Sequence, residues 1–254
     1  MATKKFHDFT PDKNFTKLLH GYSGNVVNGV GENQKRRPSM VWWAPDPASA
    51  PFGEAQKWFY SREQPDEEML ELRKARHEVV AQPTPEVADE KEFRDPHEWT
   101  AELQQFITSG DCEMTGVTPL DPDWVFDHEA STLPNIVMLG VQHDYDELKH
   151  VPAIKGGKDV TRQYLRAAAA AKKVAAWLRE QGYQADAVTG PMTGKILMIP
   201  PAIACGFGEL GKHGSIINQE FGSAFRLSAV LTDAPFASTP PREFGIDDFC
   251  SRCR

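Results

Sequence analysis

The sequence predicts an α/β fold, a sheet with packed helices. Three observations support this prediction: a continuously apolar run that ends at Val141, a long amphipathic helix that ends near Gln181, and a strand candidate directly after it. Strand, helix and strand over this length form a βαβ unit, in which the helix packs on the sheet. Because the first strand is apolar throughout, we expect both faces of the sheet to be covered.

The elements of the first half are few. In the N-terminal part only the segment 66–79 is predicted to be a helix, with acidic residues at its N-terminus, as the helix dipole favours. A second helix is expected over 99–109 and ends at Gly110, a normal C′ residue. Strands follow over 112–120 and 134–141.

The long helix is predicted over 160–181. Its apolar residues recur every three or four positions, at Tyr164, Ala168, Ala171, Ala175 and Leu178. Asp159 is expected to be its N-cap, and Gly182 is expected to end it. Strands over 183–188 and 225–231 complete the sheet.

Length and composition limit the class of protein. The 254 residues suffice for one large domain or two small ones. We expect an irregular, proline-rich region over 1–95, an α/β domain over 96–240, and the beginning of a further domain over 241–254. A net charge of −8 without a long basic run argues against a nucleic-acid partner.

The sequence also predicts the compartment. Four unevenly placed cysteines do not form a disulfide framework and favour a reducing environment. No stretch reaches the ~20 apolar residues of a membrane span. The N-terminus lacks the apolar segment of a signal peptide, and the apolar run after Arg36 and Arg37 is too short for export. We therefore expect a cytoplasmic protein without a membrane partner.

A glycine-rich turn carries one candidate motif. Gly206 to Gly211 matches the dinucleotide pattern G-x-G-x-x-G, and Asp233 follows where a ribose-binding acid would lie. This alternative would make the chain a nucleotide-dependent oxidoreductase. The pattern requires a strand before it and a helix after it, whereas here prolines precede it and further glycines follow. The match is therefore weak.

The last residues carry a C-x-x-C pair, Cys250 and Cys253. Ferredoxin-type clusters are held by C-x-x-C-x-x-C-x-x-x-C-P, so the pair predicts the first part of such a motif, in the front portion of a longer protein. The alternative is a tail that happens to carry two thiols. His143, His150 and His213 lack a metal-ligand spacing, and we interpret them as structural or surface residues.

The block A-I-A-C-G-F-G-E-L-G-K-H-G-S-I-I-N-Q-E-F-G-S-A-F-R-L-S-A-V-L-T-D-A-P-F, followed by F-C-S-R-C, resembles the cobalamin-dependent reductive dehalogenases. It is also similar to the epoxyqueuosine reductases, which typically have a Trp in place of Glu209. The likeness extends back more loosely to Val137 and covers roughly the second half of the chain. It implies a nitroreductase-like, corrinoid-binding core.

The resemblance further implies reductive cleavage of a carbon–halogen bond in a small organohalide at cobalamin. A ferredoxin- or flavin-reductase-type donor would supply electrons through two 4Fe–4S clusters. The proton-donating tyrosine of the family falls best on Tyr145, with Tyr164 a poorer match, and its tuning cation falls on Lys212. An ammonium beside a phenol lowers the pKa of that phenol.

The resemblance also indicates cofactor contacts and cluster ligands, at Gly208, Glu209, Gly211, Ser215, Cys250 and Cys253. The second half of the first cluster motif and all of the second do not occur in these residues, which argues against cobalt reduction by this chain alone. The alternatives are a non-catalytic corrinoid- or partner-binding fragment and an epoxyqueuosine-reductase-like enzyme.

Overall fold

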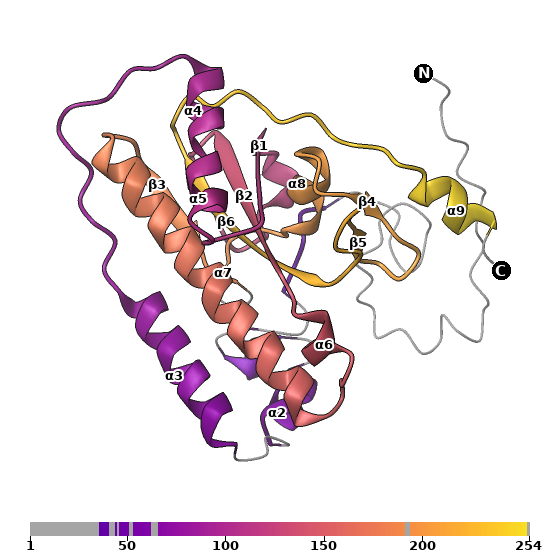
Figure 1. Ribbon diagram of the computed structural model, residues 1–254. Coiled ribbons are helices and arrows are strands. Elements are labelled where there is room, and N and C mark those ends of the chain that lie inside the picture. The colour runs from indigo at the N-terminus through magenta and orange to yellow at the C-terminus, as the bar shows by residue number, and fades with distance from the viewer. Residues whose placement is uncertain are drawn as a thin grey trace.

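Four strands form the central sheet, in the order β1–β2–β6–β3 (Figure 1). They are β1 (Met114–Pro119), β2 (Asn135–Gln142), β6 (Phe225–Thr232) and β3 (Ala185–Val188). The computed structural model describes residues 36–40, 44, 46–50, 53–61, 66–190 and 194–252. Around the sheet lie eight helices, two short 3-10 turns and a small hairpin in these residues: η1 (Pro47–Ser49), α2 (Gly53–Ser61), α3 (Glu67–Ala81), α4 (Pro96–Glu102), α5 (Gln104–Thr108), η2 (Pro122–Trp124), α6 (Tyr145–Leu148), α7 (Ile154–Glu180), α8 (Ile199–Ala204), β4 (Glu209–Leu210), β5 (Ile216–Ile217) and α9 (Ile246–Arg252).

The predicted α/β fold is confirmed, with one strand inserted into the βαβ unit. β2 and β3 both pair antiparallel with β6, so they run parallel to each other with β6 between them. Helix α7 connects the two and packs along β6. In Figure 1, α7 crosses in front of the sheet, and α3 lies beside it on the outer side.

The sheet is covered on both faces, as the apolar run of β2 predicts. Val137 and Leu139 pack in a core with α4, α5 and α7. The alternate residues Ile136 and Met138 pack in a second core with the end of α8 and the segment around Phe207. Because successive side chains of a strand point to opposite faces of the sheet, β2 contributes residues to both cores.

The predicted N-cap at Asp159 is wrong. Helix α7 begins six residues earlier than expected, after Ala153, which makes no side-chain cap hydrogen bond. Asp159 lies inside the helix with no exposed surface, because His143 and Gln163 bind its carboxylate. The sequence predicts a later start because glycine disfavours helix, and Gly156 lies in the first turn. In the structure Gly156 packs so closely on Val151 that there is no room for a Cβ.

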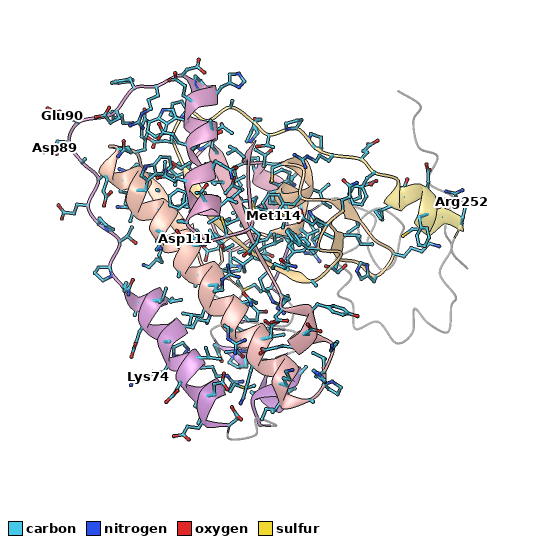
Figure 2. All side chains as sticks on the ribbon, in the orientation of Figure 1. Lys74, Asp89, Glu90, Asp111, Met114 and Arg252 are labelled. Atoms are coloured by element: carbon cyan, nitrogen blue, oxygen red, sulfur yellow. The ribbon has the colours of Figure 1, made fainter. Side chains whose placement is uncertain are left out.

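The two other predicted helices lie near their predicted positions, whereas α2, α6, α8 and α9 form where the sequence pattern predicts no helix. Asp66 caps α3 by accepting a hydrogen bond from the N–H of Met69 (3.0 Å). The segment 99–109 forms two short helices, α4 and α5, that meet at Leu103, and the chain turns at Gly110 with a φ of 78°. Asp111, labelled in Figure 2, lies just beyond this turn and pairs with Lys173 of α7.

Within the part of the chain that the structure describes, no helix has both the length and the apolar character needed to cross a membrane.

Candidate functional site

A polar cleft opens where β2 ends and α6 begins. Its volume is about 430 Å³. The lining residues come from the start of β1, the β2–α6 junction and α7: Glu113, Gln142, His143, Asp144, Tyr145, Asp146, Gln163 and Arg166. Asp144 shapes this junction, because its carboxylate accepts hydrogen bonds from the N–H groups of Asp146 and Glu147 and caps α6.

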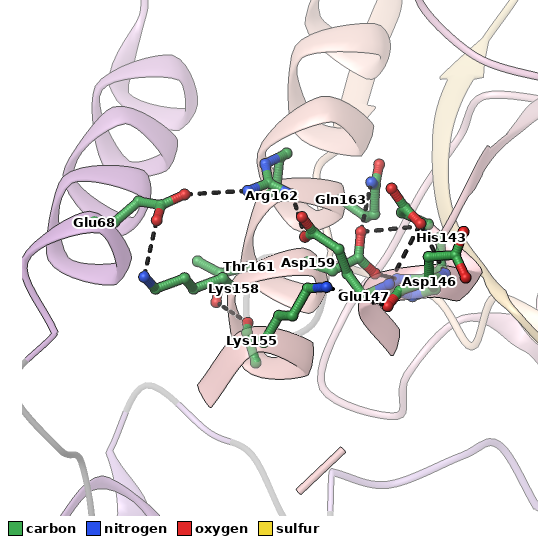
Figure 3. A network of polar contacts seen from close by, with 12 residues as sticks. Glu68, His143, Asp146, Glu147, Lys155, Lys158, Asp159, Thr161, Arg162 and Gln163 are labelled. Carbon is green, nitrogen blue, oxygen red and sulfur yellow. Dashed lines mark hydrogen bonds and ion pairs between the residues drawn. The ribbon is translucent and has the colours of Figure 1, made fainter. Parts of the chain in front are cut away.

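One lining residue, His143, forms a buried pair with Asp159 of α7 (Figure 3). His143 Nδ1 lies 2.5 Å from Asp159 Oδ2, and the side chains are 4% and 0% exposed. Asp159 Oδ1 also accepts from Gln163 Nε2 (2.9 Å) and from the N–H of Asp144 (3.2 Å). Within the described residues His143 Nε2 makes no hydrogen bond, and His143 lines the cavity.

The protonation of this pair follows from its surroundings. Burial lowers the pKa of His143, and the hydrogen bond to Asp159 opposes that effect without cancelling it. Burial acts to raise the pKa of Asp159, but the hydrogen bonds from Gln163, His143 and Asp144 outweigh it and leave that pKa below its usual value. The pair is therefore a neutral imidazole that donates from Nδ1 to a carboxylate.

An ion-pair network holds the cleft in place (Figure 3). Arg162 of α7 binds Glu147 of α6 (2.7 Å) and Glu68 of α3 (3.1 Å). One turn earlier, Lys158 binds Glu68 (2.8 Å) and Asp66 (3.2 Å). The start of α7 is thus tied to both neighbouring helices.

The two predicted catalytic residues lie on separate elements. Tyr145 opens α6 at the mouth of the cleft and is 70% exposed. Lys212 is exposed in the turn between β4 and β5, and it is not among the residues that line the cleft. Their pairing therefore stays a prediction.

The glycine turn does not have dinucleotide-binding geometry. Helix α8 precedes it and the hairpin β4–β5 follows, whereas the motif requires a strand and then a helix. Asp233, the proposed ribose-binding acid, accepts from the N–H of Gln184 (2.7 Å) and pairs with Lys91 (3.1 Å). The structure therefore does not support the alternative of a nucleotide-dependent oxidoreductase.

The residues predicted to contact a cofactor shape this turn. Gly208 is buried so closely on the hairpin that a Cβ would lie 2.1 Å from the carbonyl oxygen of Ile217. The N–H of Gly211 donates to the carbonyl of Ser215 (2.8 Å) and closes the β4–β5 turn. The backbone therefore requires glycine at 208, whereas a Cβ on Gly211 would meet the side chain of His213, at 2.5 Å from Nδ1.

Glu209 joins the turn to the C-terminal segment. Its Oε2 accepts from the N–H groups of Phe244 (2.7 Å) and Ile246 (3.2 Å), at the start of α9. Burial acts to raise the pKa of Glu209, but backbone hydrogen bonds from residues 244–247 outweigh it and lower that pKa. The helix that carries Cys250 is thereby anchored beside the turn.

The cysteines divide into two kinds. Cys112 and Cys205 are buried, and burial raises the pKa of each thiol to about 12, so neither is a reactive thiolate. Cys250 is partly buried on α9. Cys253 lies outside the described residues. Among the described residues, no three His, Cys, Asp or Glu side chains gather to hold a metal ion.

Comparison with known proteins supports the resemblance seen in the sequence. No protein-family profile matches the chain. The tetrachloroethene reductive dehalogenase of Dehalobacter restrictus is 33% identical over 154 residues, which are 60% of this chain and 27% of that protein. Its counterpart in Sulfurospirillum multivorans is 23% identical over 124 residues, 49% of this chain and 24% of the relative.

Solved structures agree on the fold. A catabolic reductive dehalogenase matches with a TM-score of 0.66 at 18% identity, over 73% of this chain and 29% of that one. The chain thus spans just over a quarter of the length of the Dehalobacter relative and of this solved dehalogenase. The predicted resemblance to reductive dehalogenases is confirmed.

Proposed function

We propose that this chain, a relative of the reductive dehalogenases in sequence and in fold, forms the corrinoid-side part of an oxidoreductase that cleaves a carbon–halogen bond. The observation that supports this most is the contact between Glu209 and the start of α9. It joins the turn that carries the resemblance to the helix that carries Cys250. The proposal includes a small organohalide as substrate, an external electron donor and a cytoplasmic location.

In this proposal the corrinoid lies against the outer surface of the glycine turn. Leu210 is 54% exposed there, and no atom of the described residues lies within 4 Å of the position that a Cβ on Gly214 would take. An exposed apolar side chain beside open space can lie against a macrocycle. Cys250, by contrast, is one described thiol where a 4Fe–4S cluster needs four ligands, so the described residues do not form a cluster site.

The reaction takes two electrons and one proton. The carbon–halogen bond breaks, a carbon–hydrogen bond forms, and halide leaves. A bound corrinoid would supply the electrons; the protein would supply the proton and position the substrate. In this proposal the phenol of Tyr145 donates the proton from the mouth of the cleft, and Lys212 stabilises the phenolate that remains.

The test is halide release from an organohalide by the purified chain with added cobalamin and a low-potential reductant. We expect Tyr145→Phe and Lys212→Ala to lower the rate roughly 100-fold or more, as loss of a general acid does. Lys195→Ala, which removes a lysine paired with Asp186 on β3, is the matched control. A rate unchanged in Tyr145→Phe but lost in Tyr164→Phe would move the proton donor to α7.

The non-catalytic alternative rests on the single cluster thiol among the described residues. It predicts that the chain binds cobalamin but releases no halide with any reductant. Halide release that depends on cobalamin and on Tyr145 would exclude it.

A further inference from the structure

His143 has one ring nitrogen that is open to the cleft at the end of β2. Its Nδ1 lies 2.5 Å from Asp159 Oδ2, and an ionised carboxylate can only accept, so Nδ1 carries the proton and Nε2 holds a free lone pair. Within the described residues Nε2 makes no hydrogen bond, and it is not among the fully buried polar atoms that lack a partner. Solvent therefore reaches this nitrogen through the cleft that His143 lines, although the side chain is only 4% exposed.

Hydrogen bonds fix the carboxylate behind the ring, from Gln163 on one side and His143 on the other (Figure 3). Nη1 of Arg166 in turn donates to Oε1 of Gln163 (3.0 Å). Because a guanidinium has no acceptor, this contact leaves the amide nitrogen of Gln163 to donate to Asp159 (2.9 Å). The donors of this network are directed at Asp159, which keeps its negative charge and its position beside Nδ1 of His143.

The ring of His143 is surrounded by charges from several elements. Those that line the cleft come from the residue before β1, the β2–α6 junction and α7: Glu113, Asp144, Asp146 and Arg166. The positive charge of Arg226 on β6, like burial, lowers the pKa of His143. A proton taken up at Nε2 gives an imidazolium that the carboxylate of Asp159 stabilises. The ring is thus neutral at rest and can carry a proton in passing.

Tyr145 lines the same cleft, two residues further along the chain. In the proposed reaction its phenol gives a proton to carbon in each turnover and must recover one. A substrate that lies against the phenol covers it from bulk water, which leaves the cleft as the side from which a proton can return. A water takes up about 30 Å³ in the liquid, so a cleft of about 430 Å³ holds several waters, enough to connect two of its lining groups.

We propose that the His143–Asp159 pair is a proton relay for Tyr145, which rests on the proposed function. Nε2 takes a proton from solvent, and the imidazolium passes it through water in the cleft to the phenolate oxygen. An N–H bond breaks, an O–H bond forms, and no electron moves. Asp159 holds the tautomer of the ring and stabilises its charge while it carries the proton. His143 acts through Tyr145 and does not contact the substrate.

The first test is halide release by His143→Ala with cobalamin and a low-potential reductant, at low buffer concentration. We expect the rate to fall roughly 100-fold, the lower end of the effect of a general acid–base group. Imidazole in solution should restore the rate in proportion to its concentration, whereas pyrazole, a ring of the same size and far lower basicity, should not. Imidazole should not accelerate the wild type or Tyr145→Phe, which excludes a direct effect on cobalamin.

His150→Ala is the matched control. It removes an exposed imidazole shortly after α6 that is not among the residues that line the cleft. Its rate should equal that of the wild type, with and without imidazole. If His143→Ala does not fold, His143→Asn decides the outcome, because its amide keeps a donor for Asp159 but cannot carry a proton. Its rate should fall by the same factor.

The second test requires neither cobalamin nor substrate. Diethyl pyrocarbonate acylates neutral imidazole nitrogens that solvent reaches, and peptide mass spectrometry locates the adduct. We expect His143 to be acylated in the folded chain despite its burial, with the exposed His150 as the internal standard. Halide release should fall in step with acylation of His143 and return when hydroxylamine removes the adduct.

The possible failures can be told apart. A wild-type rate in the His143 variants, or a lowered rate in His143→Ala that imidazole does not restore, would leave the ring a structural role and overturn the relay alone. Acylation of His150 without acylation of His143 would show that Nε2 is closed to the cleft, which also overturns the relay. A wild-type chain that releases no halide would contradict the proposed function itself, and the relay with it.

Discussion

Glu209→Gln should release the start of α9 from the glycine turn. The wild-type carboxylate accepts two backbone hydrogen bonds, at 2.7 and 3.2 Å, from Phe244 and Ile246. Glutamine keeps one oxygen acceptor of the same reach but loses the charge. Since hydrogen bonds to charged groups contribute about 1.5–3 kcal/mol and neutral ones about 1, we expect the local free energy of opening to fall by about 1–2 kcal/mol.

Hydrogen exchange followed by mass spectrometry measures this opening. A fall of 1–2 kcal/mol corresponds to roughly 5- to 30-fold faster exchange of residues 243–252, with the central sheet unchanged. Glu220→Gln is the control, because Glu220 is exposed in the loop after β5 and its side chain does not cap α9. Exchange of 243–252 at the same rate in both variants would refute the anchoring role of Glu209.

The same contact predicts a dependence on pH. The folded-state pKa of Glu209 is lowered, so its stabilisation of α9 is complete above the ordinary pKa of the carboxyl group. It is lost as the pH falls through the lowered pKa. In the wild-type chain, segment 243–252 should loosen under acid, whereas in Glu209→Gln it should be loose at every pH.

Three further perturbations test the fold and the cleft. Gly208→Ala should lower stability by about 1–3 kcal/mol in urea unfolding, since its Cβ would meet the carbonyl of Ile217; an unchanged midpoint would contradict this close contact. Asp159→Ala should cost about 1–3 kcal/mol by leaving buried donors unpaired; an unchanged midpoint would contradict the role of the carboxylate. Because burial lowers the pKa of His143, the unfolded chain takes up its proton first, so stability should be constant above pH ~6.5 and fall below it. His143→Gln should remove part of that fall.

The sequence predicts the two central strands, β2 and β6, well because they are long and mostly apolar. The run around Val137 is buried on both faces, and the repeat at Ala168, Ala171 and Ala175 identifies the buried side of α7. Local pattern suffices there, because period and burial agree. It fails at Asp159, whose role depends on His143, sixteen residues away. An aspartate can cap a helix or accept hydrogen bonds inside the protein, and the local sequence does not distinguish these two roles.

The candidate sites show the same limit. Nothing local in the sequence indicates that Glu113, which precedes β1, meets Arg166 of α7 in the wall of the cleft. The anchoring role of Glu209 depends on a contact with residues 244–247. The polar run H-D-Y-D directly follows β2, and four of the residues that line the cleft come from it, because polar residues at the end of a buried strand lie at the edge of the sheet.

Anaerobic titration of the purified chain with cob(II)alamin, followed by visible absorbance, tests the central claim most directly. The proposed function predicts saturable binding with a shift to the base-off spectrum, weakened by substitution in the turn from Gly208 to Ser215. A spectrum unchanged at every protein concentration would contradict the claim that this chain forms a corrinoid-binding part of a dehalogenase.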